Sequence, residues 1–397
     1  MSIGSPLHTR TAPLARKLDY REWSGYLAAS AYYFRHIHEY VGIRHAAVMI
    51  DVSPLYKTIV SGRDAVHLID RVITRDATKI KPGQVIYAPW CDESGKVIDD
   101  GTIARLDDDS FRWTSAEPHQ RWFRLNARGL DVEIDDVSEA HAAIALQGPL
   151  SRAVLEAATG ETWADVGFYR RRPAKVARIA IDVSRTGYTG DLGYELWVDG
   201  PRAVALWDTL MEVGRPFGLR AAGMRALDMA RLEAGLVLIE VDYTSARHAL
   251  VAAQSYSPYE LGFGRLVNLD KATQFVGRRA LAAEQAAGGP PRRLVGLSIE
   301  WPAIESLYAA QDLPIFVEAA TWREQRPVYA GSRQVGRATS GTWSPLLKQH
   351  IALASVEAAY EPLGTQLALE WTVEGRRGRA AANVAALPFF DPPRKRA

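Results

Sequence analysis

One carboxylate, Glu195, closes a run of regularly spaced glycines, and this spacing gives a first indication of chemistry. Gly187, Gly190 and Gly193 precede it within residues 184–197. Glycine lets a backbone approach a ligand closely because it has no Cβ. A carboxylate held there can accept paired hydrogen bonds from the amidine-like edge of a heterocycle. The pattern is not the GxGxxG of dinucleotide sites, and on spacing alone an ordinary turn with a solvated glutamate is the better explanation.

The glycine run lies between a predicted strand and a predicted helix. Residues 176–183 alternate apolar and polar side chains, which indicates a half-buried strand. After the run, a Gly-Pro pair precedes apolar residues at helical spacing over 206–213. We therefore expect a tight connection that carries Glu195 to a fixed place.

A second candidate for chemistry is the pair Asp99-Asp100, which follows the apolar Val97-Ile98. Adjacent residues in a strand face opposite ways, so only one of the two carboxylates can point into a given pocket. Such a carboxylate can exchange a proton or stabilise a developing positive charge. From the residues alone, a solvent-facing turn is the alternative.

The sequence gives no pattern for a metal site. His36 and His38 are separated by one residue, but no third ligand follows at a recognisable spacing. Cys91 is the single cysteine, which excludes an internal disulfide and a cysteine cage. P-loop, nucleophile-elbow and His-Glu-x-x-His motifs are absent from the sequence as well. We expect no metal.

Composition indicates an ordinary globular protein of two or three domains, with 397 residues, 47% of them hydrophobic and 24% charged. The net charge of +2 is too small for a nucleic-acid-binding field. No apolar stretch reaches the length of a membrane span, and the N-terminus lacks the pattern of a secretory signal. We expect a cytoplasmic protein that binds neither nucleic acid nor membrane.

Strand and helix patterns alternate without a regular repeat, which favours an α+β fold over a doubly wound sheet. A Gly-Pro-rich run at 286–291 interrupts both helix and central strand. Short strand patterns such as 294–299 and 350–356 follow it with little helical pattern, which suits a small β-barrel. We expect a catalytic region over 1–287, built of two intertwined subdomains, and a barrel domain over 292–392.

Seven motifs in order resemble the aminomethyltransferase superfamily, whose founder is the T-protein of the glycine cleavage system. Segment 185–195, Arg-Thr-Gly-Tyr-Thr-Gly-x-x-Gly-Tyr-Glu, is similar to the folate-binding segment of that family. The other six motifs lie at 49–53, 97–100, 147–149, 231–235, 275–278 and 339–345. One match is weak, but seven in order are specific. The resemblance implies a T-protein-like folate-binding core, a small C-terminal β-barrel and tetrahydrofolate as the cofactor.

The resemblance also implies roles for individual residues. Asp100 matches the catalytic carboxylate that lies near the folate nitrogens, and Glu195 matches the acid of the folate segment. Tyr87, Tyr169 and Tyr188 match positions that pack against the pterin or its linker, which suits aromatic rings beside a flat heterocycle. For a lone tyrosine, a place in the core is the commoner alternative.

Two cofactor positions depart from the family pattern. Ser115 stands where the family has an asparagine, and Leu227 replaces the usual arginine. Arg225 lies two residues before Leu227 and is expected to contact the cofactor instead. Folate binding is thus expected to be retained with altered contacts.

The largest departure is segment 236–256, which borders the one-carbon donor in the family. It has twenty-one residues, about nine more than in the T-protein, and it lacks the family's Gly-Gln-acid step. Arg247 can bind a donor carboxylate, with Tyr256 beside it, and His248 or Tyr243 can protonate a leaving atom. The alternative is a longer surface loop with Arg247 and His248 in solvent.

Together these features favour a tetrahydrofolate-dependent methyltransferase that demethylates a small O-, N- or S-methyl donor to give 5-methyltetrahydrofolate. One alternative is a glycine-cleavage aminomethyltransferase, which takes its carbon from a lipoyl carrier protein and forms 5,10-methylenetetrahydrofolate. A second alternative is a non-catalytic folate-binding protein of iron–sulfur assembly. Those relatives carry a Lys-Gly-Cys-Tyr-x-Gly-Gln motif, whereas Cys91 lies elsewhere.

Overall fold

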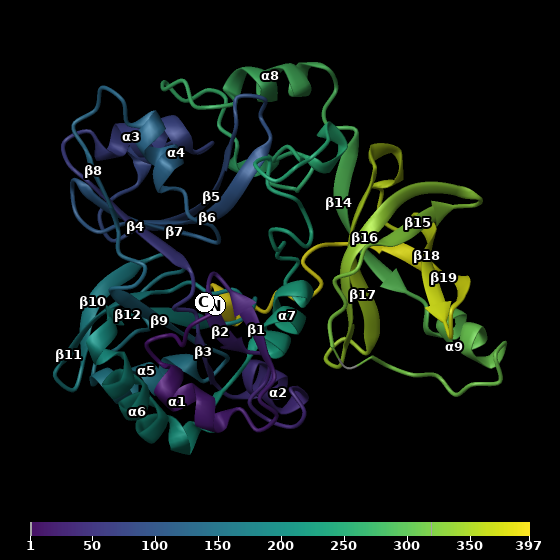
Figure 1. Cartoon of the computed structure of the whole chain (residues 1–397), viewed down its shortest axis with the longest axis horizontal. Helices are drawn as coiled ribbons and strands as arrows, with labels where there is room; N and C mark the ends of the chain where they lie inside the picture. Colours follow the sequence, from purple (N-terminus) through teal and green to yellow (C-terminus); the bar gives the residue numbers. More distant parts are fainter. Residues whose placement is uncertain (1, 319) are drawn as a thin grey trace.

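Three large β-structures organise the chain in the computed structural model, which describes residues 2–318 and 320–397. Figure 1 shows two sheet-based lobes on the left and a closed barrel on the right. The short strands β1 (Tyr20–Trp23) and β2 (Tyr26–Ala29) form a separate two-stranded sheet. Within the described residues, no helix has the length and apolar character needed to cross a membrane.

A six-stranded sheet with helices on both faces forms the first lobe. Its strand order is β10-β11-β12-β9-β3-β13. The strands are β3 (Val48–Asp51), β9 (His141–Gln147), β10 (Arg171–Val176), β11 (Ile179–Ser184), β12 (Gly193–Asp199) and β13 (Arg220–Ala221). Alternation along β9 explains the two faces, because Ile144 packs towards α5 (Ser151–Thr159) and α6 (Ala203–Gly214). Ala145 packs towards α2 (Ile37–His45) and α7 (Met224–Glu233).

A five-stranded sheet forms the second lobe, in the order β5-β6-β7-β4-β8. Its strands are β4 (Tyr56–Ser61), β5 (Val85–Cys91), β6 (Val97–Arg105), β7 (Ser110–Ser115) and β8 (Glu133–Asp136). Helices α3 (Ala65–Val72) and α4 (Gln120–Asn126) cover one face with an aromatic core. In that core the rings of Trp113 and Phe123 stack with centroids 4.1 Å apart. Burial of these rings stabilises this face of the sheet.

The closed barrel has the strand order β14-β17-β16-β15-β18-β19. Its strands are β14 (Arg292–Ile299), β15 (Arg326–Ala330), β16 (Arg333–Ser344), β17 (Gln349–Glu357), β18 (Gln366–Val373) and β19 (Arg376–Ala385). Helix α8 (Arg278–Ala286) precedes the barrel, and α9 (Trp301–Ala309) packs beside β18 and β19. The α+β class and the C-terminal barrel predicted from the sequence are therefore confirmed.

Two local predictions were wrong. Residues 176–183 do not form one strand, because Ala177 and Arg178 make the turn between β10 and β11, with Ala177 at φ 52°. A two-residue turn without glycine or asparagine gives little sequence signal. Helix α9 also interrupts the region in which mainly strands were expected.

The Arg-Leu-Glu motif of α7 joins the first lobe to the barrel. Glu233 accepts bonds from Arg44 at 2.9 and 2.6 Å, from the hydroxyl of Ser344 at 2.6 Å and from the hydroxyl of Tyr40. These three partners are all donors, which a fully buried carboxylate requires. The motif therefore has a structural role in fixing the barrel against α2 and α7.

Candidate active site

Asp100 lies at the centre of the candidate site, on β6. Its two carboxylate oxygens accept hydrogen bonds from two tyrosines, Tyr87 on β5 at 2.6 Å and Tyr243 from segment 236–256. Burial, followed by the charge of Asp99, raises the pKa of Asp100 to about 7, and the two hydroxyls act in the opposite direction. At neutral pH this carboxyl group can therefore both take up and release a proton.

Asp99 faces the other side of β6, as strand alternation requires. It is fully buried and accepts bonds from the Asp100 N–H at 2.7 Å, the Glu117 N–H at 3.2 Å and His119 Nε2 at 2.8 Å. Burial raises the pKa of Asp99 to about 7 as well. The two neighbouring carboxylates thus have separate environments, and Asp100 is the one that faces the tyrosines.

His119 connects Asp99 to Arg247. Arg247 Nη1 lies 3.2 Å from His119 Nδ1. Because a guanidinium can only donate, Nδ1 accepts, and the ring proton is on Nε2, which donates to Asp99. Burial and the charge of Arg247 lower the pKa of His119 to about 3, so the ring is neutral at physiological pH. Sequence analysis did not identify His119. A buried carboxylate needs a hydrogen-bond donor, so burial of Asp99 would have predicted a donor on its side of β6, but not which residue supplies it.

Segment 236–256 is held along the start of β6. Ser245 Oγ donates to the carbonyl of Ile98 at 2.6 Å, and the Ala246 N–H donates to the carbonyl of Val97 at 2.8 Å. These bonds bring Tyr243 to Asp100 and Arg247 to His119. The segment that borders the one-carbon donor by the family resemblance therefore lies beside Asp100.

Asp242 fixes the same segment to the barrel. This buried carboxylate pairs with Arg231 of α7 and accepts bonds from the hydroxyls of Thr339 and Ser340, each at 2.6 Å. Thr339 and Ser340 belong to β16. The position of Tyr243 is thus determined by both α7 and the barrel.

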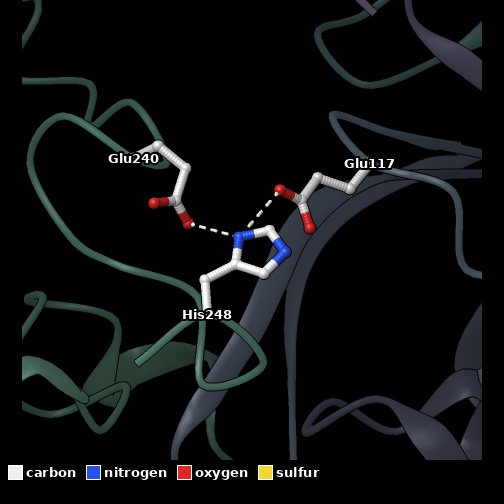
Figure 2. A group of neighbouring side chains, drawn as sticks. All are labelled: Glu117, Glu240 and His248. Carbon is white, nitrogen blue, oxygen red and sulfur yellow. Dashed lines mark hydrogen bonds and ion pairs between the residues drawn. The ribbon is translucent and has the colours of Figure 1, made fainter. Parts of the chain in front are cut away.

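His248 lies between two carboxylates at the edge of the segment (Figure 2). Its Nδ1 is 3.1 Å from Glu240 and 3.4 Å from Glu117. The three groups offer ligand atoms within 4.8 Å of one another and could hold a metal by residue type. His248 and Glu240 have side chains 50% and 42% exposed, and the hydrogen bond between them accounts for their geometry without a metal. Sequence analysis did not identify this group.

Glu195 is half-buried on β12, where the hydroxyl of Thr186 donates to it. Burial raises its pKa, while Thr186 and the charge of Arg112 lower it. Arg112 stacks on Trp197 at 4.1 Å and pairs with Asp182 at 2.7 Å. The carboxylate is therefore held near one fixed cation without being paired to it directly.

The glycines before Glu195 make room for protein side chains. A Cβ on Gly187 or Gly193 would lie 2.1 or 2.2 Å from Oε1 of Gln147, and one on Gly190 would lie 2.4 Å from Ala234. Gln147 in turn donates to the carbonyls of this connection. We expected these glycines to leave room for a ligand. That interpretation was wrong at these three positions, because Gln147 and Ala234 occupy the space.

Three other predicted residues lie on the surrounding elements. The hydroxyl of Tyr188 donates to the carbonyl of Val237 at the start of segment 236–256. Burial, followed by the charge of Glu195, raises the pKa of Tyr169 to about 12. Ser115 is buried at the end of β7 and donates to the carbonyl of Glu117 at 2.7 Å. Tyr188 therefore joins the glycine connection to segment 236–256.

Arg225 and Tyr256 lie outside this arrangement. Arg225 pairs with Asp19 at 2.8 Å in a partly exposed ion pair. Tyr256 is 1% exposed, with Arg292 4.5 Å above its ring and Arg337 donating to its hydroxyl. In the described part of the chain neither residue contacts Asp100 or Glu195, and their roles in binding cofactor or donor stay predictions.

A two-lobed α+β core with a closed C-terminal barrel is the architecture of the glycine cleavage T-protein. Residues 15–271 match the GCVT N-terminal domain, and residues 292–391 match the glycine cleavage T-protein C-terminal barrel domain. The fold is similar to a crystal structure of glycine cleavage system aminomethyltransferase T from Bartonella henselae, with a TM-score of 0.82 at 24% identity over 98% of this chain and 99% of that chain.

Similar sequences extend over almost the whole chain. An aminomethyltransferase of Moorella thermoacetica is 34% identical over 363 residues, 90% of each chain. A trimethylamine-oxide aldolase of Ruegeria pomeroyi is 33% identical over 372 residues, 91% of this chain but 44% of the relative. The chain belongs to the T-protein (GCVT) family of folate-dependent transferases. It is an enzyme of the aminomethyltransferase type, and members of its family bind tetrahydrofolate.

Proposed function

We propose that this enzyme is a tetrahydrofolate-dependent methyltransferase that demethylates a small O-, N- or S-methyl donor to give 5-methyltetrahydrofolate. The observation that carries the proposal is the position of segment 236–256. Its Tyr243 bonds to Asp100 and its Arg247 bonds to His119. By the sequence resemblance, this segment takes the place of the shorter Gly-Gln-acid loop of the T-protein.

The residues present suit tetrahydrofolate. Glu195 offers a half-buried carboxylate for the amidine-like edge of a pterin, and Tyr169 lies close enough for the charge of Glu195 to raise its pKa. Asp100 offers a second carboxylate, held by Tyr87 and Tyr243. When bound, the cofactor would supply the nucleophilic amine nitrogen that accepts the carbon. These are the groups that a flat, amine-bearing heterocycle requires.

Asp100 has the properties of the central catalytic group. A pKa of about 7 lets it accept a proton at neutral pH, and its negative charge would stabilise positive charge at the transferred carbon. Tyr87 and Tyr243 fix its orientation through one hydroxyl on each oxygen. Tyr243 and His248 are the proposed donors of a proton to the leaving atom.

Arg247 is the proposed contact for a donor carboxylate, with Tyr256 as a second donor-binding residue. One Nη of Arg247 bonds to His119, and the guanidinium lies 5.7 Å from the ring of Trp122. Its side chain is exposed, so further N–H groups can reach a ligand. A fixed guanidinium favours donors that carry a carboxylate.

The relatives support two donor classes. Trimethylamine oxide, in the name of the Ruegeria pomeroyi relative, is an N-methyl compound, which agrees with a methyl donor. This chain spans 44% of that relative, so the relative's whole activity is not transferred. The aminomethyltransferase of Moorella thermoacetica supports the alternative of a lipoyl carrier protein as the carbon source, with 5,10-methylenetetrahydrofolate as product.

A donor panel tests the proposal. The enzyme is incubated with tetrahydrofolate and methyl ethers, methylamines or S-methyl compounds, each with and without a carboxylate. We expect 5-methyltetrahydrofolate from at least one donor, with a preference for carboxylates that Arg247→Gln abolishes. Arg121→Gln, at an exposed arginine of α4, is the matched control. Failure of every small donor, together with turnover of aminomethylated carrier protein, would establish the alternative.

A further inference from the structure

The end of the barrel beside α9 contains a cavity that includes neither the residues around Asp100 and Glu195 nor segment 236–256. Its volume is about 90 Å³, well above the ~10–15 Å³ that a single water molecule needs. The charged, imidazole and indole side chains that line it are those of Glu318, Trp322, Arg326, Trp343, His350 and Trp371. Three tryptophans around a small space provide apolar walls for a flat ligand.

His350 supplies one polar group to this cavity. It is 4% exposed and lies among Trp301, Trp343 and Trp371, with ring centroids 6.0, 5.0 and 5.3 Å away. Its Nε2 is buried and has no hydrogen-bond partner in the described part of the chain. Burial and the charge of Arg326 lower the pKa of His350 to about 4, so the ring is neutral at pH 7. A buried polar atom without a partner is rare, and a ligand group can satisfy it.

Arg326 supplies a positive charge. Its guanidinium lies 4.1 Å from the ring of Trp322 and 5.0 Å from that of Trp371. Within the described residues it forms no ion pair; Glu318, which also lines the cavity, and Glu324 act on it through their charge alone. Because the guanidinium already covers these two aromatic faces, a cationic ligand would meet a like charge, whereas a carboxylate would meet free N–H donors.

We propose that this cavity binds a small aromatic carboxylate. The ring would lie against Trp343, the carboxylate would bind Arg326, and His350 Nε2 would bond to a polar atom of the ligand. The site shares no residue with the region around Asp100 and Glu195. It is therefore a second binding site, independent of the identity of the one-carbon donor.

Binding of benzoate to the full chain tests this inference, with benzamide as the neutral and benzylammonium as the cationic analogue. Calorimetry and tryptophan fluorescence are recorded with saturating tetrahydrofolate. We expect benzoate to bind best, Arg326→Gln to weaken it by about tenfold or more, as for loss of a charge-assisted pair, and His350→Phe to weaken it several-fold. Arg379→Gln is the matched control, because Arg379 also stacks on an aromatic ring of the barrel, that of Tyr329, at 3.8 Å.

Further variants separate the possible outcomes. Arg247→Gln should leave benzoate binding unchanged, since that arginine lies in the donor segment; loss of binding in this variant would assign the carboxylate to the donor pocket. If Arg326→Gln unfolds, Arg326→Lys keeps the charge and should keep the preference for benzoate over benzamide. The inference is overturned if benzylammonium binds more tightly than benzoate, if no probe binds, or if benzoate affinity is the same in a folded Arg326→Gln.

Discussion

The hydroxyl of Tyr243 donates a hydrogen bond to Asp100, although the two residues are 143 positions apart in the chain. The residue before Tyr243, Asp242, binds Arg231, Thr339 and Ser340. Contact between the barrel and the candidate catalytic carboxylate therefore runs through two consecutive residues of one segment. In this enzyme the barrel stabilises the segment that orients Asp100.

Asp100→Asn should reduce turnover by at least roughly tenfold, because acid–base and electrostatic groups contribute that much or more. Asp99→Asn should mainly lower stability, since Asp99 is buried, is hydrogen-bonded to His119 and does not face Tyr87 and Tyr243. Turnover numbers and melting temperatures of both variants separate the two effects. A folded Asp99→Asn with the lower turnover would contradict the assignment.

Tyr243→Phe should shift the pH profile of turnover to higher pH. The hydroxyl stabilises ionised Asp100, so its removal raises a pKa that is already about 7. A hydrogen bond to a charged group is worth about 1.5–3 kcal/mol, or about one to two pKa units. Activity should fall most at and below neutral pH and recover only in part in base, since Tyr243 is also a proposed proton donor. Tyr329→Phe, whose hydroxyl bonds to Glu370 in the barrel at 3.1 Å, is the control and should leave the profile in place.

The raised pKa of Asp100 also predicts how stability depends on pH. The folded protein holds this proton between the ordinary value of 3.8 and about 7, whereas the unfolded chain has released it. The stabilisation is complete below pH 3.8 and is lost as the pH rises through about 7. Without cofactor, Asp100→Asn should therefore gain stability relative to wild type between pH 5 and pH 8 in urea unfolding. The exposed Asp135→Asn serves as the control, and a pH-independent difference would disprove the shift.

Glu195→Gln should weaken tetrahydrofolate binding by about 1.5–3 kcal/mol, the range for a hydrogen bond to a charged group. The substitution keeps the size of the side chain, and Thr186 can still donate to the amide oxygen. Titration calorimetry measures the effect, with the exposed Glu133→Gln of β8 as the matched variant. Equal affinities in wild type and Glu195→Gln would remove this residue from the cofactor site.

Local periodicity made part of the site predictable. Alternation along a strand already indicated that Asp99 and Asp100 face opposite sides, and the structure has them so. The α+β class and the barrel followed from element patterns and from the ordered motifs. The glycine spacing indicated a close approach, but it could not indicate that Gln147 is the approaching group.

Contacts between distant loops were not predictable. His119, Arg247 and Asp99 come from three separate segments, and only the fold brings them into contact. The same holds for His248 with its two glutamates. Such contacts produce no periodic pattern in the sequence, because periodicity reflects only the secondary structure around each residue.

The oxidation level of the folate product tests the central proposal most directly. Enzyme and tetrahydrofolate are mixed with both aminomethylated lipoyl carrier protein and the best small methyl donor, and the product is identified by mass spectrometry. We predict 5-methyltetrahydrofolate, formed at a rate that depends on the small donor and is reduced in Asp100→Asn. Formation of 5,10-methylenetetrahydrofolate from the carrier protein, with no methyl product, would contradict the account and identify a glycine-cleavage aminomethyltransferase.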